Sequence, residues 1–217
     1  MTGSGPFPTG FLADGPPDAA ATIMLAHGAG APMDTPWMNA IAGAIAARGL
    51  RVIRFEFAYM AARRSGAPRK PPPRAEKLIS EYRDAIRALG PSRCLVIGGK
   101  SMGGRVASMI AGACDGEWLA NGLLCLGYPF HPPGKPSSLR TAHLEGLQTP
   151  ALICQGTRDP FGTVEDVQAY DLPHTIRLHW LEDGDHDFKP RKASGLTLQD
   201  HVESVAQTVA RFAGTLG

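Results

Sequence analysis

Short apolar runs alternate with longer amphipathic segments along this sequence. Most of the apolar runs are continuous, as in strands that are buried on both faces of a sheet. The expected strands are Thr22–Ala26, Arg51–Phe57, Arg93–Ile97, Gly122–Leu126, Ala151–Cys154 and Ile176–Leu181. The expected helices are Pro36–Arg48, Ala75–Leu89, Met102 to about Cys114, and Thr197–Thr215, and the first two end at a glycine.

This alternation of strands and helices predicts the α/β class. Parallel β-α-β units cover both faces of their sheet with helices, so we expect one doubly wound, mostly parallel sheet. No internal repeat or second-domain boundary interrupts the pattern. Residues 1–217 are therefore expected to form a single domain, in which residues 1–20 are a Gly/Pro-rich N-terminal segment.

The segment Met60–Arg74 interrupts the alternation because it is dense in Arg, Lys and Pro. We expect it to be a loop without regular structure. It follows the strand Arg51–Phe57, and loops at the carboxyl ends of strands line the ligand-binding edge of such sheets. The segment carries Arg63, Arg64, Arg69, Lys70 and Arg74, and its guanidinium groups, those of Arg63 and Arg64 first, could bind a carboxylate or phosphate of the substrate there. The alternative is a solvated loop with no binding role, because charge runs usually face water.

Composition, charge and cysteine spacing argue against nucleic-acid-binding, metal-binding, secreted and membrane proteins. A chain of 217 residues can bury a substantial core, and its net charge of +2 gives no argument for a nucleic-acid partner, so none is expected. The four cysteines lack C-x-x-C spacing, so we expect no metal site, no disulfide framework and no cofactor. Residues 1–17 lack the pattern of a signal peptide, and no apolar run reaches the ~18 residues that span a bilayer. We therefore expect a cytoplasmic protein without membrane contact.

The segment Gly99-Lys100-Ser101-Met102-Gly103 matches G-x-S-x-G, which places a nucleophilic serine on a sharp strand-to-helix turn. The context fits, because an apolar strand precedes the motif and a helix of small residues follows it. Glycine at 99 and 103 removes side chains that would collide at such a turn. The alternatives are an ordinary tight turn or a phosphate-binding loop. The dinucleotide fingerprint, however, has a different glycine spacing and belongs to the first turn of its fold.

Two further strand ends carry the partners that an activated serine needs. Asp159 follows the strand Ala151–Cys154, and His186 follows the strand Ile176–Leu181, which gives the chain order serine, acid, histidine. We expect His186 to take the proton of Ser101, and Asp159 to orient the imidazole and stabilise the imidazolium. The competing acids are Asp166, Asp183, Asp185 and Asp187. Asp159 is preferred because an acid adjacent to the histidine in sequence rarely reaches its Nδ1 atom.

The segment His27-Gly28-Ala29-Gly30 follows the first strand and resembles loops of the H-G-x-G type, which donate a backbone N–H to an oxyanion. The second donor in such sites is the residue after the nucleophile, so we expect Ala29 and Met102 to form an oxyanion hole. The alternative is a glycine-rich turn without a role.

The other histidines have weaker contexts. His131 follows a strand end and is a candidate for lining the substrate pocket. His143, His174, His179 and His201 have no motif around them and are expected to be structural or surface residues.

Four separated motifs resemble one family. They are Gly99–Arg105, Tyr128–Lys135, Gly156–Gly162 and Gly184–Lys189. Together they are similar to the small α/β-hydrolase-like family that includes the testis-expressed hydrolase-like protein and the hydrolase-like domain of a non-specific-lethal chromatin complex subunit. The chain resembles dienelactone hydrolases more distantly, and those enzymes carry Cys where this chain has Ser101. The resemblance implies the α/β-hydrolase fold and a triad of Ser101, Asp159 and His186.

The expected function is hydrolysis of an ester or thioester of a small molecule, acidic substrates included, through an acyl-enzyme. The alternative is a binding or scaffold protein of the same fold with little catalysis. The enzyme is favoured because nucleophile, acid, base, both elbow glycines and a candidate oxyanion loop are all present. About 20 residues separate Tyr128 from Pro150, too few for a helical cap, so we expect an open site. The sequence reveals neither the oligomeric state nor the role of Lys100.

Overall fold

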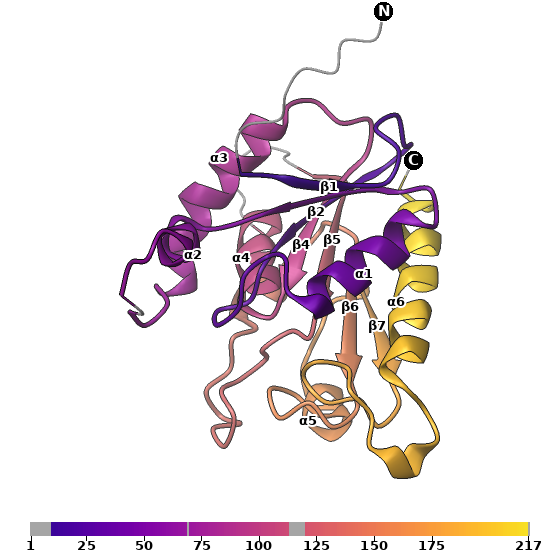
Figure 1. Ribbon diagram of the computed structural model, residues 1–217. Helices are drawn as coiled ribbons and strands as arrows, with labels where there is room; N and C mark the ends of the chain where they lie inside the picture. Colours follow the sequence, from indigo (N-terminus) through magenta and orange to yellow (C-terminus); the bar gives the residue numbers. More distant parts are fainter. Residues whose placement is uncertain (1–9, 69, 113–119, 217) are drawn as a thin grey trace, which may run out of the picture.

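A computed structural model describes residues 10–68, 70–112 and 120–216. These residues form one seven-stranded sheet with the strand order β1-β3-β2-β4-β5-β6-β7 (Figure 1). The strands are β1 (Leu12–Asp14), β2 (Thr22–Ala26), β3 (Arg51–Phe55), β4 (Leu95–Lys100), β5 (Gly122–Leu126), β6 (Ala151–Gly156) and β7 (Ile176–Leu181). All neighbouring pairs are parallel except β1 with β3. The predicted α/β fold with a mostly parallel sheet is confirmed.

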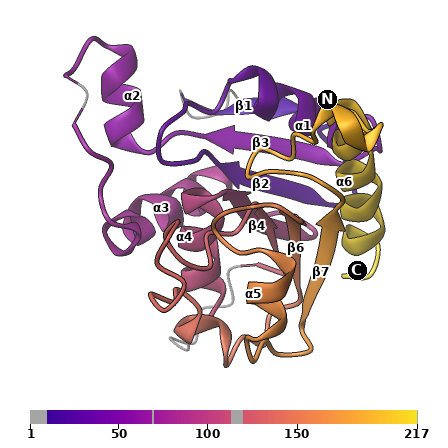
Figure 2. The same ribbon diagram turned by 90° about the horizontal axis from the view of Figure 1, so that it is seen from below.

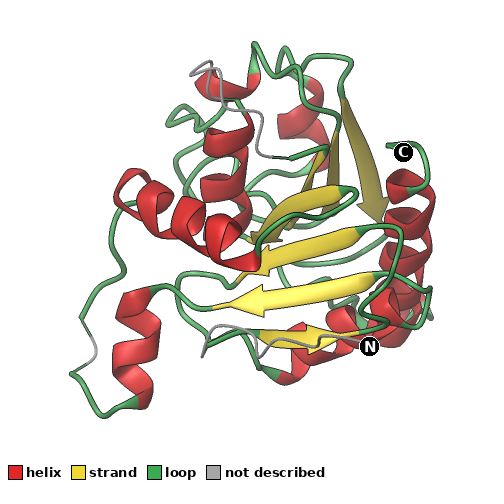
Figure 3. Cartoon of the chain, turned by 90° about the horizontal axis from the view of Figure 1, so that it is seen from above, coloured by secondary structure: helices red, strands yellow, loops and turns green. Residues whose placement is uncertain are grey.

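Helices cover both faces of this sheet (Figures 1 and 3). One face carries α1 (Pro36–Ala46) and α6 (Leu198–Ala213), and the other carries α3 (Ile79–Leu89) and α4 (Met102–Ala111). The shorter helices are α2 (Ala58–Arg64), α5 (Val164–Gln168) and the 3₁₀ turns η1 (Ala75–Leu78), η2 (Ala142–Leu144) and η3 (Lys192–Ser194). The helix expected over Ala75–Leu89 is therefore η1 running into α3.

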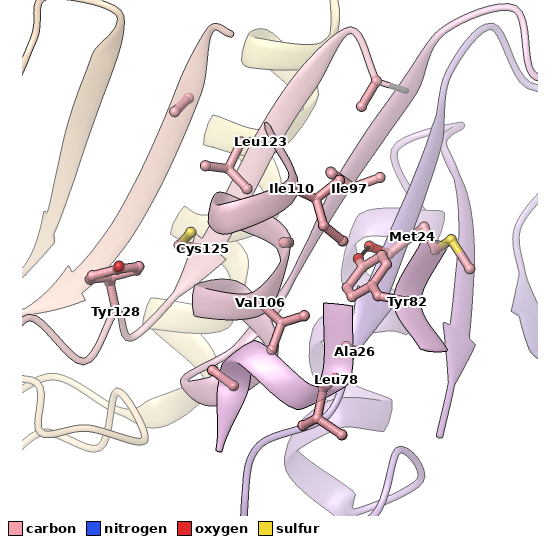
Figure 4. Close-up of a cluster of buried hydrophobic side chains, with 14 of the residues drawn as sticks. Met24, Ala26, Leu78, Tyr82, Ile97, Val106, Ile110, Leu123, Cys125 and Tyr128 are labelled. Carbon is pink, nitrogen blue, oxygen red and sulfur yellow. Dashed lines mark hydrogen bonds between the residues drawn. The ribbon is translucent and has the colours of Figure 1, made fainter. Parts of the chain in front are cut away.

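The apolar residues of the central strands divide between two cores because side chains alternate across a sheet. In β4, Leu95 and Ile97 join the core beneath α3 and α4, whereas Val96 joins the core beneath α1 and α6. Figure 4 shows the first of these cores, in which Val106 and Ile110 of α4 lie against the strands. Both faces being buried explains why the strands read as continuous apolar runs.

The expectation of an irregular loop over Met60–Arg74 is wrong at its beginning. Residues Ala58–Arg64 form α2, which projects away from the sheet in Figure 2. Three alanines and the absence of glycine and proline favour a helix here, and Arg63 and Arg64 in its last turn suit the negative end of the helix dipole. Three consecutive prolines at 71–73 keep the later part of the segment irregular. Arg69 lies outside the described residues.

A further strand, β1, lies in the N-terminal segment for which no strand was expected. It pairs with β3 at the edge of the sheet, and its Asp14 accepts a hydrogen bond of 2.9 Å from the buried guanidinium of Arg54. The helix expected to reach Cys114 ends at Ala111 in the described part, and Cys114 lies outside it.

Between Tyr128 and Pro150 the chain forms only the short turn η2, so this segment supplies no cap domain. None of the helices in the described ranges is both long and apolar enough to cross a membrane.

Candidate active site

Loops from four strands meet at one edge of the sheet. Because β2, β4, β6 and β7 are parallel, their carboxyl ends lie on the same side. Ala29 follows β2, Ser101 follows β4, Asp159 follows β6, and His186 follows β7. The fold thus carries these four residues of the sequence-predicted site to one edge.

Ser101 occupies a strained turn between β4 and α4. Its φ of 50° and ψ of −112° lie in a region that residues other than glycine rarely adopt. The glycines of the motif make this turn possible, since a Cβ on Gly103 would lie 2.6 Å from the carbonyl oxygen of Ala26, and one on Gly99 would collide with the same atom. Ser101 is also the N-cap of α4, where free backbone N–H groups and the positive end of the helix dipole are found.

Asp159 and His186 are joined by a hydrogen bond of 2.8 Å between Oδ2 and Nδ1. The Asp159 carboxylate is fully buried, and its charge is met by two further donors, Gln155 Nε2 at 3.0 Å and the Phe161 N–H at 2.9 Å. The Phe161 ring lies against the imidazole with centroids 4.3 Å apart. The imidazole is therefore fixed in position, with Nε2 as the ring nitrogen that remains for a reacting group.

The other acids considered from the sequence form hydrogen bonds or ion pairs with groups other than the His186 imidazole. Asp166 caps α5 through Thr163, and Asp183 forms ion pairs with Arg158 and Arg191. The carboxylate of Asp185 accepts hydrogen bonds from the backbone N–H groups of Asp187 and Lys189, and that of Asp187 lies 3.2 Å from the ammonium of Lys100. The Arg191 guanidinium lowers the pKa of Asp183 to about 2. Among the described residues, the acid hydrogen-bonded to His186 is Asp159.

Lys100 is buried beside the site and holds the histidine loop. Its ammonium donates a 2.7 Å hydrogen bond to the backbone carbonyl of His186 and lies 5.4 Å from the centre of the Trp37 ring. Burial lowers the pKa of Lys100, while the nearby carboxylate of Asp187 acts in the opposite direction. The residue next to the nucleophile thus connects the turn of Ser101 to the loop that carries His186.

The loop after β2 is held by a neutral histidine. His27 is fully buried, and burial lowers its pKa. Its Nδ1 lies 2.6 Å from the Gly28 carbonyl and its Nε2 accepts a 3.2 Å hydrogen bond from the Phe57 N–H, which fixes the tautomer with the proton on Nδ1. Tyr59 donates to the Ala29 carbonyl at 3.0 Å. Within the described ranges, the N–H groups of Ala29 and Met102 have no protein acceptor.

Two pockets open on either side of Ser101. The first, which we name the tryptophan pocket, has a volume of about 430 Å³ and includes Pro32, Trp37, Met38, Lys100 and His186. The second, the arginine pocket, has a volume of about 610 Å³ and includes Arg74, Glu76, Met102, Arg105 and Arg140. Ala29, Ser101 and Phe161 line both. Ser101 and His186 share the tryptophan pocket, although no hydrogen bond joins them within the described residues. Such contacts are often long before substrate binds.

Of the substrate-binding candidates from the sequence, Arg74 lines the arginine pocket, whereas His131, Arg63 and Arg64 line neither pocket. His131 is buried, with its ring nitrogens 2.9 Å from the Pro132 carbonyl and 3.3 Å from Asp166. Arg64 forms ion pairs with Asp34 and Glu56, and Arg63 donates to the Lys70 carbonyl. None of the three is among the residues that line the two pockets.

A second serine–histidine pair lies deeper in the fold. Ser108 of α4 is fully buried, and its Oγ is 2.8 Å from His143 Nε2. The Ser108 hydroxyl donates to the Arg105 carbonyl at 2.8 Å, and Tyr128, 3.3 Å from the same Nε2, donates to the Arg140 carbonyl. Both hydroxyl protons are thus used, so His143 donates from Nε2 and is not oriented to act as a base toward Ser108.

Sequence reasoning did not find Gln155, Phe161, Trp37, Arg105 or Arg140. Gln155 and Phe161 flank Asp159 closely in sequence, and a search for donors to a buried acid could have found them. Trp37 reaches the site from the first turn of α1, and its Nε1 donates to the Asp187 carbonyl at 2.7 Å. No local pattern marks Arg140, because only the fold brings it near Ser101.

Solved structures with the same fold include several hydrolases. A dienelactone hydrolase from Anabaena variabilis has a TM-score of 0.70 and 19% identity, covering 95% of this chain and 91% of that one. A serine hydrolase without a lid from Xanthomonas campestris has a TM-score of 0.66 and 20% identity, covering 93% and 88%. The esterase domain of a Rhodothermus marinus protein has a TM-score of 0.65 and 17% identity, covering 94% and 92%.

These likenesses concern the fold alone, since all are below 25% identity. The sequence itself matches the family described as "Alpha/beta hydrolase domain" over residues 19–214. That match spans the sheet from β2 to β7, both helical layers and every residue of the candidate site. The chain therefore belongs to the alpha/beta hydrolase domain family.

Proposed function

We propose that this protein is a serine hydrolase that cleaves an ester or thioester of a small molecule. The observation that carries the proposal is the hydrogen bond from the imidazole of His186 to the buried Asp159, in a loop that shares a pocket with Ser101. In this proposal Ser101 is the nucleophile, His186 the general base and Asp159 the acid that orients the imidazole. The hydrolases and esterases among the structurally similar proteins support the reaction class.

The proposed reaction has two halves. In the first, Ser101 Oγ attacks the carbonyl carbon while His186 Nε2 takes the hydroxyl proton. The bond to the leaving oxygen or sulfur then breaks, and His186 gives the proton to the leaving atom. In the second, water attacks the acyl-enzyme, His186 takes a proton from the water, and Ser101 leaves as the protonated hydroxyl. The acid product is released and the site is restored.

The backbone N–H groups of Ala29 and Met102 are the proposed oxyanion hole. Met102 is the first residue of α4, where an N–H has no partner within the helix. Preorganised donors of this kind stabilise the transition state by about 3 kcal/mol each. The hydrogen bonds of His27 and Tyr59 to the loop after β2 support this proposal, because they fix that loop before substrate arrives.

The subgroup of the alpha/beta hydrolase family to which this chain belongs is also a proposal. The four motifs that resemble the testis-expressed hydrolase-like proteins support a place for this chain near that group. The competing function, a binding protein of the same fold, is disfavoured by the strained backbone of Ser101. Strain of this kind costs about 1–3 kcal/mol, and it has no evident use in a protein that only binds.

A fluorophosphonate probe tests the proposed function, because it reacts with an activated serine whatever the natural substrate. We expect stoichiometric labelling of the purified protein at Ser101, located by peptide mass spectrometry. Ser101→Ala should abolish the labelling, and His186→Gln should slow it on the order of 10³-fold. Ser108→Ala is the matched control and should label like the wild type. Absence of labelling in protein with a cooperative unfolding transition would favour the binding protein instead.

A further inference from the structure

The arginine pocket carries an excess of positive charge beside Ser101. Among the described residues, those that line it and carry charge are Arg74, Arg105 and Arg140, with Glu76 as the acid. Arg105 donates a 2.8 Å hydrogen bond to Glu76, so the negative charge of the Glu76 carboxylate is already paired. Arg74 is exposed to solvent at the mouth of the same pocket. The pocket therefore favours an anionic ligand.

Arg140 has no counter-ion in the described part of the chain. Within the described ranges, no carboxylate lies within ion-pair distance of its half-buried guanidinium. Burial and the neighbouring charge of Arg105 lower the pKa of Arg140, although a guanidinium remains charged at neutral pH. Two such charges facing one cavity repel each other, and a bound carboxylate would relieve both the repulsion and the lost hydration.

The backbone around Arg140 is anchored, so its position is defined. The Arg140 N–H donates to the Phe130 carbonyl at 2.8 Å, and the Arg140 carbonyl accepts a 2.9 Å hydrogen bond from the buried Tyr128 hydroxyl. Tyr128 and Phe130 follow the carboxyl end of β5, so this segment is fixed to the same edge of the sheet as Ser101. Arg140, which lines the pocket, thus stands on a held segment.

The position of His186 indicates which half of the substrate enters this pocket. The histidine must give its proton to the leaving group, so the leaving group lies on the side of the imidazole. His186 lines the tryptophan pocket and is absent from the lining of the arginine pocket. The acyl group, which stays on Ser101, is therefore directed toward Arg105 and Arg140.

The size of the arginine pocket limits the length of the acyl group. Arg105 lies one turn after Ser101 on α4, and its N–H donates to the Ser101 carbonyl at 3.0 Å. The arginine pocket begins at Ser101 and has a volume of about 610 Å³, which gives room for a short acyl chain with a second carboxylate.

We propose that the arginine pocket binds a carboxylate at the far end of the acyl group, which makes half-esters or half-thioesters of short dicarboxylic acids the substrate class. This inference rests on the proposed function, to which it adds the chemistry of the acyl group. Arg140 provides the principal contact, Arg105 contributes from α4, and the tryptophan pocket receives an apolar leaving group.

The test compares two esters that differ only in the distal charge. The para-nitrophenyl half-ester of glutaric acid carries the free carboxylate, and its methyl-capped diester does not. We expect the wild type to hydrolyse the charged ester with a kcat/KM at least about tenfold higher, because charge-assisted hydrogen bonds are stronger than neutral ones. Arg140→Gln should remove this preference and change hydrolysis of the capped ester less than about threefold. Arg177→Gln, an exposed change of equal charge on β7, should preserve the preference.

Binding without turnover separates the two proposals. Titration calorimetry of Ser101→Ala with monomethyl glutarate should show an affinity that falls about tenfold or more when Arg140→Gln is added. Arg140-dependent binding without hydrolysis or probe labelling would uphold the pocket and overturn the proposed function. Equal hydrolysis of both esters would overturn the pocket alone. An Arg140-dependent preference for para-carboxyphenyl acetate, which carries its charge on the leaving group, would overturn the assignment to the acyl side.

Discussion

The helix α4 carries two serines that lie close to histidines, and their surroundings differ in every respect that bears on catalysis. Ser101 at its N-cap opens on two pockets, whereas Ser108, two turns later, is fully buried. Of the two pairs, the buried one is hydrogen-bonded in the described part of the chain, with Ser108 Oγ 2.8 Å from His143 Nε2. A short serine–histidine distance is thus a poor guide to a nucleophile. An acid on the histidine, free backbone donors and space for a carbonyl group are better guides.

The two histidines also differ in the groups that surround them. Asp159 holds Nδ1 of His186, and a carboxylate there stabilises an imidazolium. His143 has no such partner in the described part of the chain, and burial, followed by the charge of Arg105, lowers its pKa to about 4. His143 therefore stays neutral at pH 7, as suits a residue that links α4 to η2.

The same substitution at the two histidines gives the largest expected difference. Glutamine can donate a hydrogen bond but cannot take up the serine proton, so His186→Gln should lower kcat on the order of 10⁴-fold on an activated ester. His143→Gln keeps a donor for Ser108 and should change kcat less than about threefold. Steady-state kinetics on both variants measures this, with circular dichroism to confirm folding. A large loss in His143→Gln alone would reverse the assignment of the two pairs.

Lys100 provides a smaller and more specific perturbation. Lys100→Met removes the hydrogen bond to the His186 carbonyl while keeping an apolar side chain of similar length. We expect kcat to fall roughly ten- to a hundredfold with KM little changed, because a displaced imidazole impairs proton transfer more than binding.

Asp187→Asn is the control for Lys100. It removes the largely exposed partner of the ammonium and should lower kcat less than about twofold. A raised KM with normal kcat in Lys100→Met would instead make Lys100 a substrate-binding residue.

The smallest expected effect concerns stability and pH. The folded state disfavours protonation of His143, whose pKa lies at about 4 when folded and near 6.5 when unfolded. The wild type should therefore be most stable above pH 6.5 and lose stability as the pH falls toward about 4. After solvent screening of this half-buried ring, the loss is on the order of 1 kcal/mol. His143→Gln should lack this part of the pH dependence. Urea unfolding at about pH 7.5 and pH 4.5 measures it, and parallel curves for the two proteins would contradict it.

The sequence was informative where one local pattern determines the structure. Both faces of the central strands are covered, so their apolar runs could be recognised, and the elbow could be found because Ser101 needs glycine at 99 and 103. The helix α2 was missed because the later prolines at 71–73 dominate the composition of its segment. The strand β1 was missed because pairing with β3, and not its own composition, makes it a strand.

The candidate substrate contacts were harder to predict for the same reason. Arg63 and Arg64 stood out as a charge cluster, yet Arg64 is occupied by Asp34 and Glu56. Arg140 stands alone in the sequence, and its place beside Ser101 depends on a long connection after β5. Charge density marks a residue in sequence, whereas an unpaired charge can be identified only once the fold is known.

The arrangement of the two pockets has a consequence for redesign. Among the described residues, their linings have Ala29, Ser101 and Phe161 in common, so in the proposed binding mode the two halves of a substrate meet at these three residues. Trp37 lines one pocket and Arg140 the other, so the contacts proposed for them are separate, and changes at sites that share no partner usually add in free energy. Selectivity for each half could thus evolve, or be engineered, as an independent module, while Phe161 keeps the imidazole in place for both.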